Sequence, residues 1–545
     1  MQKSIITLAI LTGLAPLNVD AGKVTVDTVL DASLVQQQYN FATSDDFEVN
    51  TLEIVPTVAL QYAAKKAQVN ASASHVQQRA SFNNDNPSLT RNFTQYSVQS
   101  QLTLIERLLI ATADYSQNYN SFNPNQFLID DFLLQADQLD KVERTRFGLM
   151  SNIIQGEYFG GQASLNRSSF NTISDIVGNS RESDSNQLSV NLYSGSDVNY
   201  YNWSVNYSKS KTDQFTGDAF TSEFVQANAG FKIFGDLGLS LSAQDESNSL
   251  SNELLTQSND RDFSSVGAGV SYSPSINRSL AIYYNKPSSS ASDNDGFVSG
   301  TINWAFSPRT IFSANASKRY YGRSSNASLS FNNRDIRIEA GRNESVSSNA
   351  QLFIDGNTTT SLVCSVGAVN LGDCFLPDTL DYQLGVGESF INFQQPNFAL
   401  GDNIVVRKQN YLNVSYQKRK LTFNLNAYDN QDLNEGDISI NTQLDTQTVS
   451  AGVDYKIGAY SALSLLHSRA DIQSFTLDTE TGEGSTKRTD ISFEREFGRD
   501  LVLSFKLSNI ARMGFLPGFN NINNEDFTDR RVTVSIRYQI TSAKK

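Results

Sequence analysis

Apolar and polar residues alternate in short stretches along most of this chain. The segment YLNVSYQKRKLTFNLNAY, residues 411–428, has an apolar residue at nearly every second position before and after a basic turn at Lys418 to Lys420. Its remaining positions are mostly Asn, Ser, Thr and Gln. A period of two places the two kinds of residue on opposite faces of a β-strand. The segment therefore predicts an antiparallel hairpin with one apolar and one polar face.

The same hairpin unit recurs from one end of the chain to the other. Ten further turns are predicted near Lys65-Lys66, Glu106-Arg107, Gln155–Tyr158, Ser194–Asn199, Phe234–Leu237, Ser273–Asn277, Ser307–Arg309, Asn332–Asp335, Ile457–Tyr460 and Phe497–Asp500. Eleven hairpins and one strand at each end, Asp27–Tyr39 and Arg531–Ile540, make 24 strands, within a range of 20 to 26. An even number of strands suits a closed antiparallel barrel.

The connections between these strands differ in length on the two sides. The predicted turns are short, whereas the other side carries the loops Asn118–Thr145, Asn171–Asp184, Gln244–Asp262 and Arg342–Lys408. Transmembrane barrels have short periplasmic turns and long extracellular loops. We therefore predict an all-β transmembrane barrel, and the apolar face of the last strand, in DRRVTVSIRYQI, should contact lipid while its polar face lines a lumen.

Aromatic residues gather near the predicted short turns. Trp304 and Phe306 precede one turn, Tyr272 precedes another, and Tyr201 and Trp203 follow a third. Transmembrane barrels carry aromatic girdles at the interfaces of the membrane, and these residues fit such a girdle. Ordinary strand aromatics are the alternative interpretation.

The N-terminus has the pattern of a secretory signal peptide. Lys3 precedes an uncharged run from Ser4 to Val19, and small residues suit cleavage between Ala21 and Gly22. No later segment is apolar over the length that a helical span requires. The prediction is a signal peptide at residues 1–21 and one barrel domain at 22–545, exported to the outer membrane of a Gram-negative envelope, in contact with its lipids and lipopolysaccharide and inserted by the barrel-assembly machinery.

Composition excludes one class of partner. The formal charge of −14 argues against nucleic acid, because phosphate binding requires a basic surface.

The C-terminus departs from common barrel chains, which end on an aromatic residue: here Thr541–Lys545 follows Ile540. The insertion signal is then either less than ideal or lies further inward, on Tyr538 and Ile540.

Three stretches resemble the outer-membrane barrel proteins associated with PEP-CTERM/exosortase systems. They are EIVPTVALQYAAKKAQVNASASH from Glu53, NIVVRKQNYLNVSYQKRKLTFNLNAYDN from Asn403, and FEREFGRDLVLSFKLSNI from Phe493 with the closing DRRVTVSIRYQI. The resemblance covers nearly the whole mature chain. It implies a barrel associated with exopolysaccharide and sorting loci, export of a surface polysaccharide or related polymer, and contact with exopolysaccharide-export components.

Few residues offer catalytic or metal chemistry. The two histidines are His75, near Ser72 and Ser74, and His467, near Ser468 and Asp471. A hydrolytic site at the barrel rim is conceivable, but isolated polar rim residues are the simpler interpretation. No spacing predicts a zinc, phosphate or dinucleotide site, so we expect no cofactor and no metal and do not predict an enzyme.

The two cysteines lie within the longest predicted loop. Cys364 and Cys374 have nine residues between them, and in an oxidising compartment they would most simply form one disulfide. Free or intermolecular thiols are the alternative. A disulfide would fix the tip of a loop long enough to fold over or into the barrel mouth, and a loop of this length is usually functional.

Charged residues on the predicted inward face are candidates for lining the lumen. They are Asp335, Arg337, Glu339, Asp454, Lys456, Glu494, Glu496, Lys506 and Arg537. They could face a hydrated pathway for polar solutes or pair with one another to stiffen a wide barrel.

Three functions follow from these features. A barrel of this size encloses more space than its side chains fill, so it holds either a channel or a plug, and a passage is the first function. The family resemblance implies that a polar polymer is what passes. A structural or receptor barrel with binding loops is the second, and a rim hydrolase that uses His75 or His467 is the third.

Overall fold

The computed structural model of this protein describes most of the predicted barrel. The described residues are 22–42, 45–83, 88–120, 132–133, 139–153, 156–173, 180–195, 197–198, 200–213, 219–251, 261–275, 277–288, 295–348, 363–365, 374–376, 388–390, 404–434, 442–477, 479–498, 500–515 and 526–541. The predicted signal peptide, residues 1–21, lies outside them. No helix in these ranges is long and apolar enough to cross a membrane.

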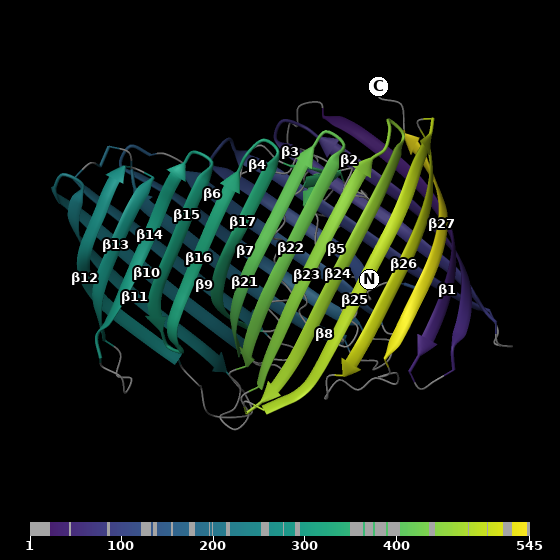
Figure 1. Ribbon diagram of the computed structural model, residues 1–545. Coiled ribbons are helices and arrows are strands. Elements are labelled where there is room, and N and C mark those ends of the chain that lie inside the picture. Colours follow the sequence, from purple (N-terminus) through teal and green to yellow (C-terminus); the bar gives the residue numbers. More distant parts are fainter. Residues whose placement is uncertain are drawn as a thin grey trace.

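The chain folds into a closed ring of 24 antiparallel strands (Figure 1). In its first half the strands are β1 (Lys23–Phe41), β2 (Phe47–Ala63), β3 (Ala67–Phe82), β4 (Leu89–Ile105), β5 (Leu109–Asn120), β6 (Asp140–Ile153), β7 (Phe159–Ile173), β8 (Ser180–Ser194), β9 (Tyr201–Asp213), β10 (Ala219–Phe234), β11 (Leu237–Ser251) and β12 (Arg261–Ser275). In its second half they are β13 (Arg278–Pro287), β14 (Phe297–Ser307), β15 (Thr310–Arg319), β16 (Gly322–Asn332), β17 (Ile336–Ser348), β21 (Ile404–Lys418), β22 (Leu421–Asn434), β23 (Thr442–Lys456), β24 (Ser461–Thr476), β25 (Thr479–Phe497), β26 (Leu501–Phe515) and β27 (Phe527–Thr541).

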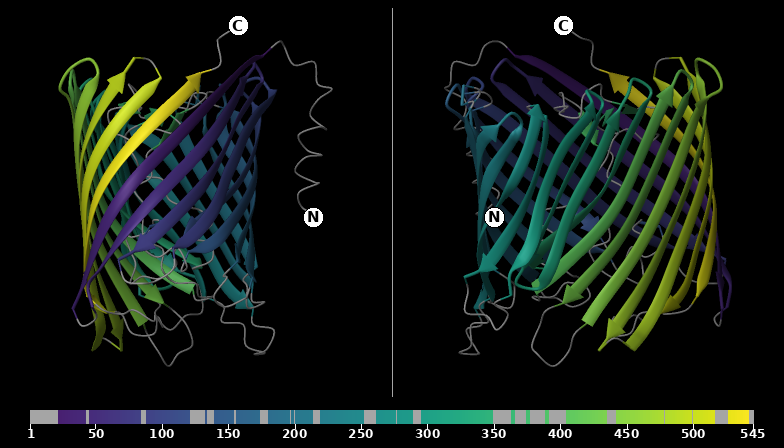
Figure 2. Two further views of the ribbon diagram at one scale, coloured as in Figure 1. Left: turned by 90° about the vertical axis from the view of Figure 1, so that its right-hand side faces the viewer. Right: turned by 60° about the vertical axis from the view of Figure 1, so that its left-hand side comes forward.

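Each strand pairs with its sequence neighbours, and two pairings complete the ring. β17 pairs with β21 across the longest loop, from Ile336↔Tyr416 to Ser348↔Ile404. β27 pairs with β1 from Asp27↔Thr541 to Phe41↔Phe527, which brings the first and last strands side by side (Figure 2). The predicted fold class and the predicted count of 24 strands are confirmed.

The connections define two unlike ends of the barrel. All the predicted short turns lie at one end, which we call the short-turn end; its longest connection, residues 195–200, joins β8 to β9. The opposite end, which we call the long-loop end, carries residues 121–139 and 349–403. In Figure 1 the short turns are at the top of the barrel.

The strands are longer than predicted, so the predicted loops were too long. Arg342–Lys408 shrinks to residues 349–403, and Asn171–Asp184 to residues 174–179. Likewise, β11 and β12 leave only residues 252–260 between them, and β5 and β6 leave only 121–139. The error has a physical cause: about 9–11 residues span a bilayer, but β1 and β25 each have 19, so their outer parts extend into water where both faces can be polar.

The outward face is apolar toward the short-turn end. On β27 the side chains of Val534 and Ile536 are 42% and 51% exposed, while Ser535 and Arg537 point inward. Aromatic residues are also exposed where the strands meet the short turns: Tyr158, Tyr200, Tyr201, Phe234, Phe306, Tyr460, Phe497 and Tyr538. An outward apolar band edged by aromatic residues is the surface that a transmembrane barrel presents to lipid.

The apolar side chains change face toward the long-loop end. On β1, Leu30 and Leu34 point outward, but Val35 and Tyr39 point inward and are buried. Other buried apolar side chains near this end are Val49, Val76, Ala80, Phe93, Val142, Phe170, Phe220, Phe263, Ala470, Ile472, Ile510 and Phe527. Because the outer face is in water beyond the bilayer, the apolar side chains there gain by packing inside the barrel.

One part of the wall folds in on itself. β10 and β17 approach each other across the interior, although strands β11 to β16 separate them in the sheet. The inner faces of β10 to β15 pack together and leave a cavity of only about 20 Å³, enough for about one water molecule. We call strands β11 to β16 the side lobe. We use the term main lumen for the interior of the barrel between the other strands.

Candidate functional site: the main lumen

The predicted lumen-lining residues cluster near the short-turn end. Eight of the nine lie on inward faces of β17, β23, β25, β26 and β27: Arg337, Glu339, Asp454, Lys456, Glu494, Glu496, Lys506 and Arg537. Asp335 is the exception, because it lies in the turn between β16 and β17, where its carboxylate is 3.5 Å from Lys418 Nζ. These strands bring together residues that are far apart in the sequence, and they form a charged belt on one side of the lumen.

Four of the eight charged residues in this belt form ion pairs. Arg337 lies 2.6 Å from Glu339, and Lys506 lies 3.2 Å from Asp490 on β25. Arg537 of β27 lies 3.2 Å from Asp31 of β1 and so bridges the closing pair of strands. The belt thus joins neighbouring strands while remaining polar toward the lumen. These pairs fit the interpretation that the charges stiffen the barrel, and the hydrated lining stays a prediction.

Part of the longest loop forms a small sheet of its own. Its strands are β18 (Val363–Ser365), β19 (Cys374–Phe375) and β20 (Glu388–Phe390), and β18 pairs with both others. Cys364 is opposite Cys374 in the antiparallel register. Cys374 is disulfide-bonded, and Cys364 is the only other cysteine in the chain. A disulfide therefore cross-links the paired strands β18 and β19.

This small sheet docks on the barrel wall through Gln417. The Gln417 side chain accepts a hydrogen bond from the Leu376 backbone N–H (3.0 Å) and donates one to the Cys374 carbonyl (2.9 Å). Gln417 is on the inward face of β21, one residue before the short turn. Val363, Cys374 and Leu376 are buried.

The position of Gln417 determines how far the loop extends. Ser348 and Ile404, which flank the loop, pair at the long-loop end. Gln417 lies at the opposite end of β21. Cys374 and Leu376 therefore lie inside the barrel, near the end opposite to the one where the loop leaves the wall. The sequence suggested a loop over or into the mouth, and it gave no sign of Gln417 as the docking residue.

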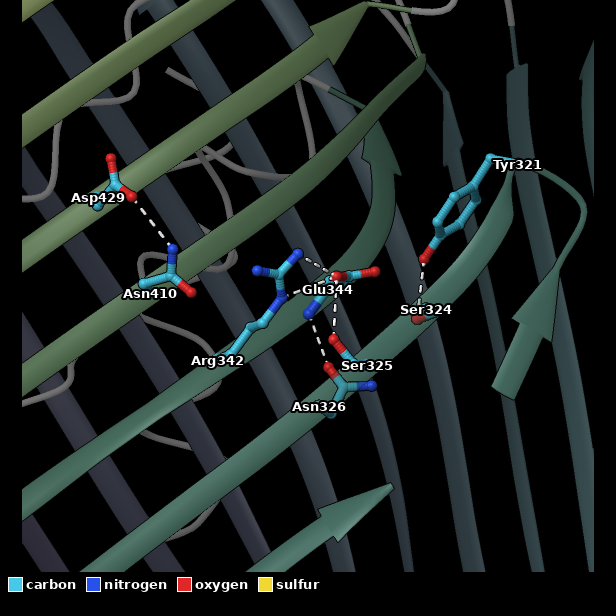
Figure 3. A network of polar contacts seen from close by, with 8 residues as sticks. All are labelled: Tyr321, Ser324, Ser325, Asn326, Arg342, Glu344, Asn410 and Asp429. Atoms are coloured by element: carbon cyan, nitrogen blue, oxygen red, sulfur yellow. Dashed lines mark hydrogen bonds and ion pairs between the residues drawn. The ribbon is translucent and has the colours of Figure 1, made fainter. Parts of the chain in front are cut away.

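The ladder between β16 and β17 covers only part of the two strands (Figure 3). Their ladder begins at Ala327↔Arg342, and side chains bridge the strands beyond it. The Glu344 N–H donates to Asn326 Oδ1 (2.7 Å), and Ser325 Oγ donates to Glu344 Oε1 (3.5 Å). Arg342 Nη2 lies 2.6 Å from the same carboxylate oxygen, Glu344 Oε1. The Glu344 side chain is only 1% exposed.

A cluster of aromatic rings lies on the inner wall at the long-loop end. Its five members, on β27, β1, β2 and β3, are Tyr39, Phe41, Phe47, Phe82 and Phe527. They line a cleft of about 230 Å³ together with Thr51, Gln78, Arg91 and Leu133. We call it the aromatic cleft. The change of face along β1 and β27 was the sequence signal that could have revealed it.

The two histidines lie on outward faces. His75 Nδ1 is 2.9 Å from Thr94 Oγ1, and His467 Nδ1 is 2.9 Å from Thr489 Oγ1. Ser468 points inward from β24, as Ser74 does from β3. A histidine and its adjacent serine are thus on opposite sides of the wall in both strands.

The chain is similar in structure to several solved barrel proteins, at low sequence identity. It is similar to the FrpB iron transporter from Neisseria meningitidis (F5-1 variant), with TM-score 0.44 and 8% identity, over 96% of this chain and 83% of that one. It is also similar to Pseudomonas aeruginosa OpdK with vanillate, with TM-score 0.33 and 9% identity, over 95% and 99% of the two chains. The copper transporter OprC gives TM-score 0.37 and 8% identity, over 94% and 80%. No family model and no curated protein matches.

Proposed function

We propose that this protein is an outer-membrane passage for a polar solute, closed at rest by its longest loop. The observation that carries the proposal is the pair of hydrogen bonds between Gln417 and the loop backbone at Leu376 and Cys374. They hold a cross-linked segment of the loop at the far end of the lumen from its point of entry. Such a segment obstructs the pathway while it is docked.

The chemistry of the wall supports a polar solute. Next to the docking residue, β21 and β22 present buried Asn413, Ser415, Asn424 and Asn426 to the interior. Amide and hydroxyl groups can donate and accept hydrogen bonds in place of water without fixing one sign of charge. A hydrated, polyhydroxylated chain suits such a surface. We extend the proposal to a polar polymer such as an exopolysaccharide, following the family resemblance.

Solute uptake into liposomes tests this proposal. The purified mature protein is compared with a variant that lacks residues 361–398, and sugars and oligosaccharides of increasing size are the solutes. We expect slow uptake by the intact protein and rapid, size-limited uptake by the deletion variant. Deletion of residues 253–259, which removes chain from another connection at the same end, is the control and should leave uptake slow. Equal exclusion by all three proteins would favour a receptor or structural barrel instead.

A further inference from the structure

We infer that the aromatic cleft is a binding site for a pyranose ring of a saccharide. This inference rests on the proposed function, because it names the solute class and places its first contact at the long-loop end of the same lumen. The rings of the cleft come from four adjacent strands, β27, β1, β2 and β3, so the wall of the barrel positions them.

The rings form a continuous apolar surface. Tyr39 and Phe47 have centroids 4.7 Å apart, and Phe47 and Phe82 are 6.4 Å apart. Phe41 continues the surface to Phe527 at 6.1 Å. Tyr39 and Phe527 are buried, whereas Phe41, Phe47 and Phe82 are only partly covered and so present ring surface to the cleft. Rings this close stabilise one another and hold a fixed geometry.

A row of polar side chains borders the rings. Thr51, Gln78 and Arg91 line the same cleft from β2, β3 and β4. Gln78 pairs with Arg91 across β3 and β4, and its amide donates to Glu53 at 2.6 Å, which fixes its orientation. Small-molecule sites commonly combine an apolar surface with a few oriented polar groups. The row supplies the polar groups of such a site.

A pyranose ring matches this arrangement. Its faces carry C–H groups, which pack on aromatic rings, and its rim carries hydroxyl groups, which hydrogen-bond with amide, hydroxyl and guanidinium groups. The volume of about 230 Å³ fits one ring at a time. Leu133, from the connection between β5 and β6, bounds the cleft, while Phe132 beside it packs on Phe93 at 4.5 Å. A wall site of this kind could receive successive rings of one chain.

The test is calorimetric binding to the purified full-length chain, which requires no passage. The probes are a linear glucose hexasaccharide, an oligouronate of similar length and, as a flat aromatic acid, benzoate. In Phe47→Leu an apolar side chain remains but the ring is lost. Phe297→Leu is the matched control, because Phe297 is another partly buried inward phenylalanine, in contact with Phe263 in the side lobe. The heat-induced mobility shift of each variant confirms its folding.

We expect at least one saccharide to bind, with affinity about tenfold weaker in Phe47→Leu and unchanged in Phe297→Leu. Absence of saccharide binding would overturn the inference, as would equal affinity in both variants. Ring-dependent binding of benzoate alone would assign the cleft to aromatic acids instead. If saccharides bind but the variant lacking residues 361–398 remains impermeable, the cleft is a saccharide site and the proposed passage is wrong.

Discussion

Arg319 and Glu246 form an ion pair across the side lobe, although three strands separate β15 from β11 in the sheet. The guanidinium contacts the carboxylate through Nη2 at 2.6 Å and Nε at 3.0 Å. The Glu246 side chain is 0% exposed and that of Arg319 15% exposed. Arg319 also lies over the rings of Phe224 and Tyr321, at 5.5 and 5.4 Å. This pair therefore holds the folded-in part of the wall together.

Removing one member of this pair should destabilise the barrel strongly. Arg319→Ala leaves a buried carboxylate without its cation, for which we expect a loss of about 3–5 kcal/mol in the free energy of unfolding. Unfolding in denaturant, followed by gel mobility, measures the loss. The exposed pair Lys209 and Glu223, 2.9 Å apart, is the control, and Lys209→Ala should cost far less, because water screens this pair. Equal losses would show that the lobe does not depend on the buried pair.

The bridge between the first and last strands should contribute modestly. Arg537 and Asp31 are 3.2 Å apart, and both side chains are about a quarter exposed. Solvent screening limits such a pair to about 1 kcal/mol. We expect Arg537→Asp to lower the unfolding midpoint and the double variant Arg537→Asp with Asp31→Arg to restore it. A double variant as weak as the single one would mean that the pair makes no favourable contact.

The docking residue of the loop should control uptake. Gln417→Leu removes both hydrogen bonds to the loop backbone, so the loop should leave its closed position more often and uptake of small sugars should rise. Gln539→Leu is the control: Gln539 is also an inward glutamine near the end of its strand, and no described loop residue hydrogen-bonds its side chain. A rise in both variants, or in neither, would argue against Gln417 as the docking residue.

The last residues of the chain should be dispensable for assembly. β27 pairs with β1 up to Thr541, so deletion of residues 542–545 removes no rung of this ladder. We expect the shortened chain to reach the membrane and to show the heat-induced mobility shift of the full-length chain. Tyr538→Ala, which removes an outward aromatic residue near the strand end, should reduce assembly more. Failure of the shortened chain alone would place the insertion signal in the tail.

The sequence predicted the strands and turns of the barrel wall more fully than the contacts inside the barrel. Period-two alternation is a local property, so it predicts strands and turns, and the turn at Lys418 to Lys420 follows directly from it. The pairing of Arg319 with Glu246 and the docking of Leu376 on Gln417 depend on how the sheet curves and where a loop goes, which no local pattern encodes. The aromatic cleft is intermediate, because the inward shift of apolar residues at Val35 and Tyr39 is visible in the alternation.

The most direct test of the account is the single-channel current through planar bilayers that contain the intact protein or the variant lacking residues 361–398. The account predicts that the intact protein is closed for most of the record and that the deletion variant gives large, sustained current steps. The control variant that lacks residues 253–259 should behave like the intact protein. Silence of the deletion variant, with its barrel shown to be folded, would contradict the claim that the loop closes a passage.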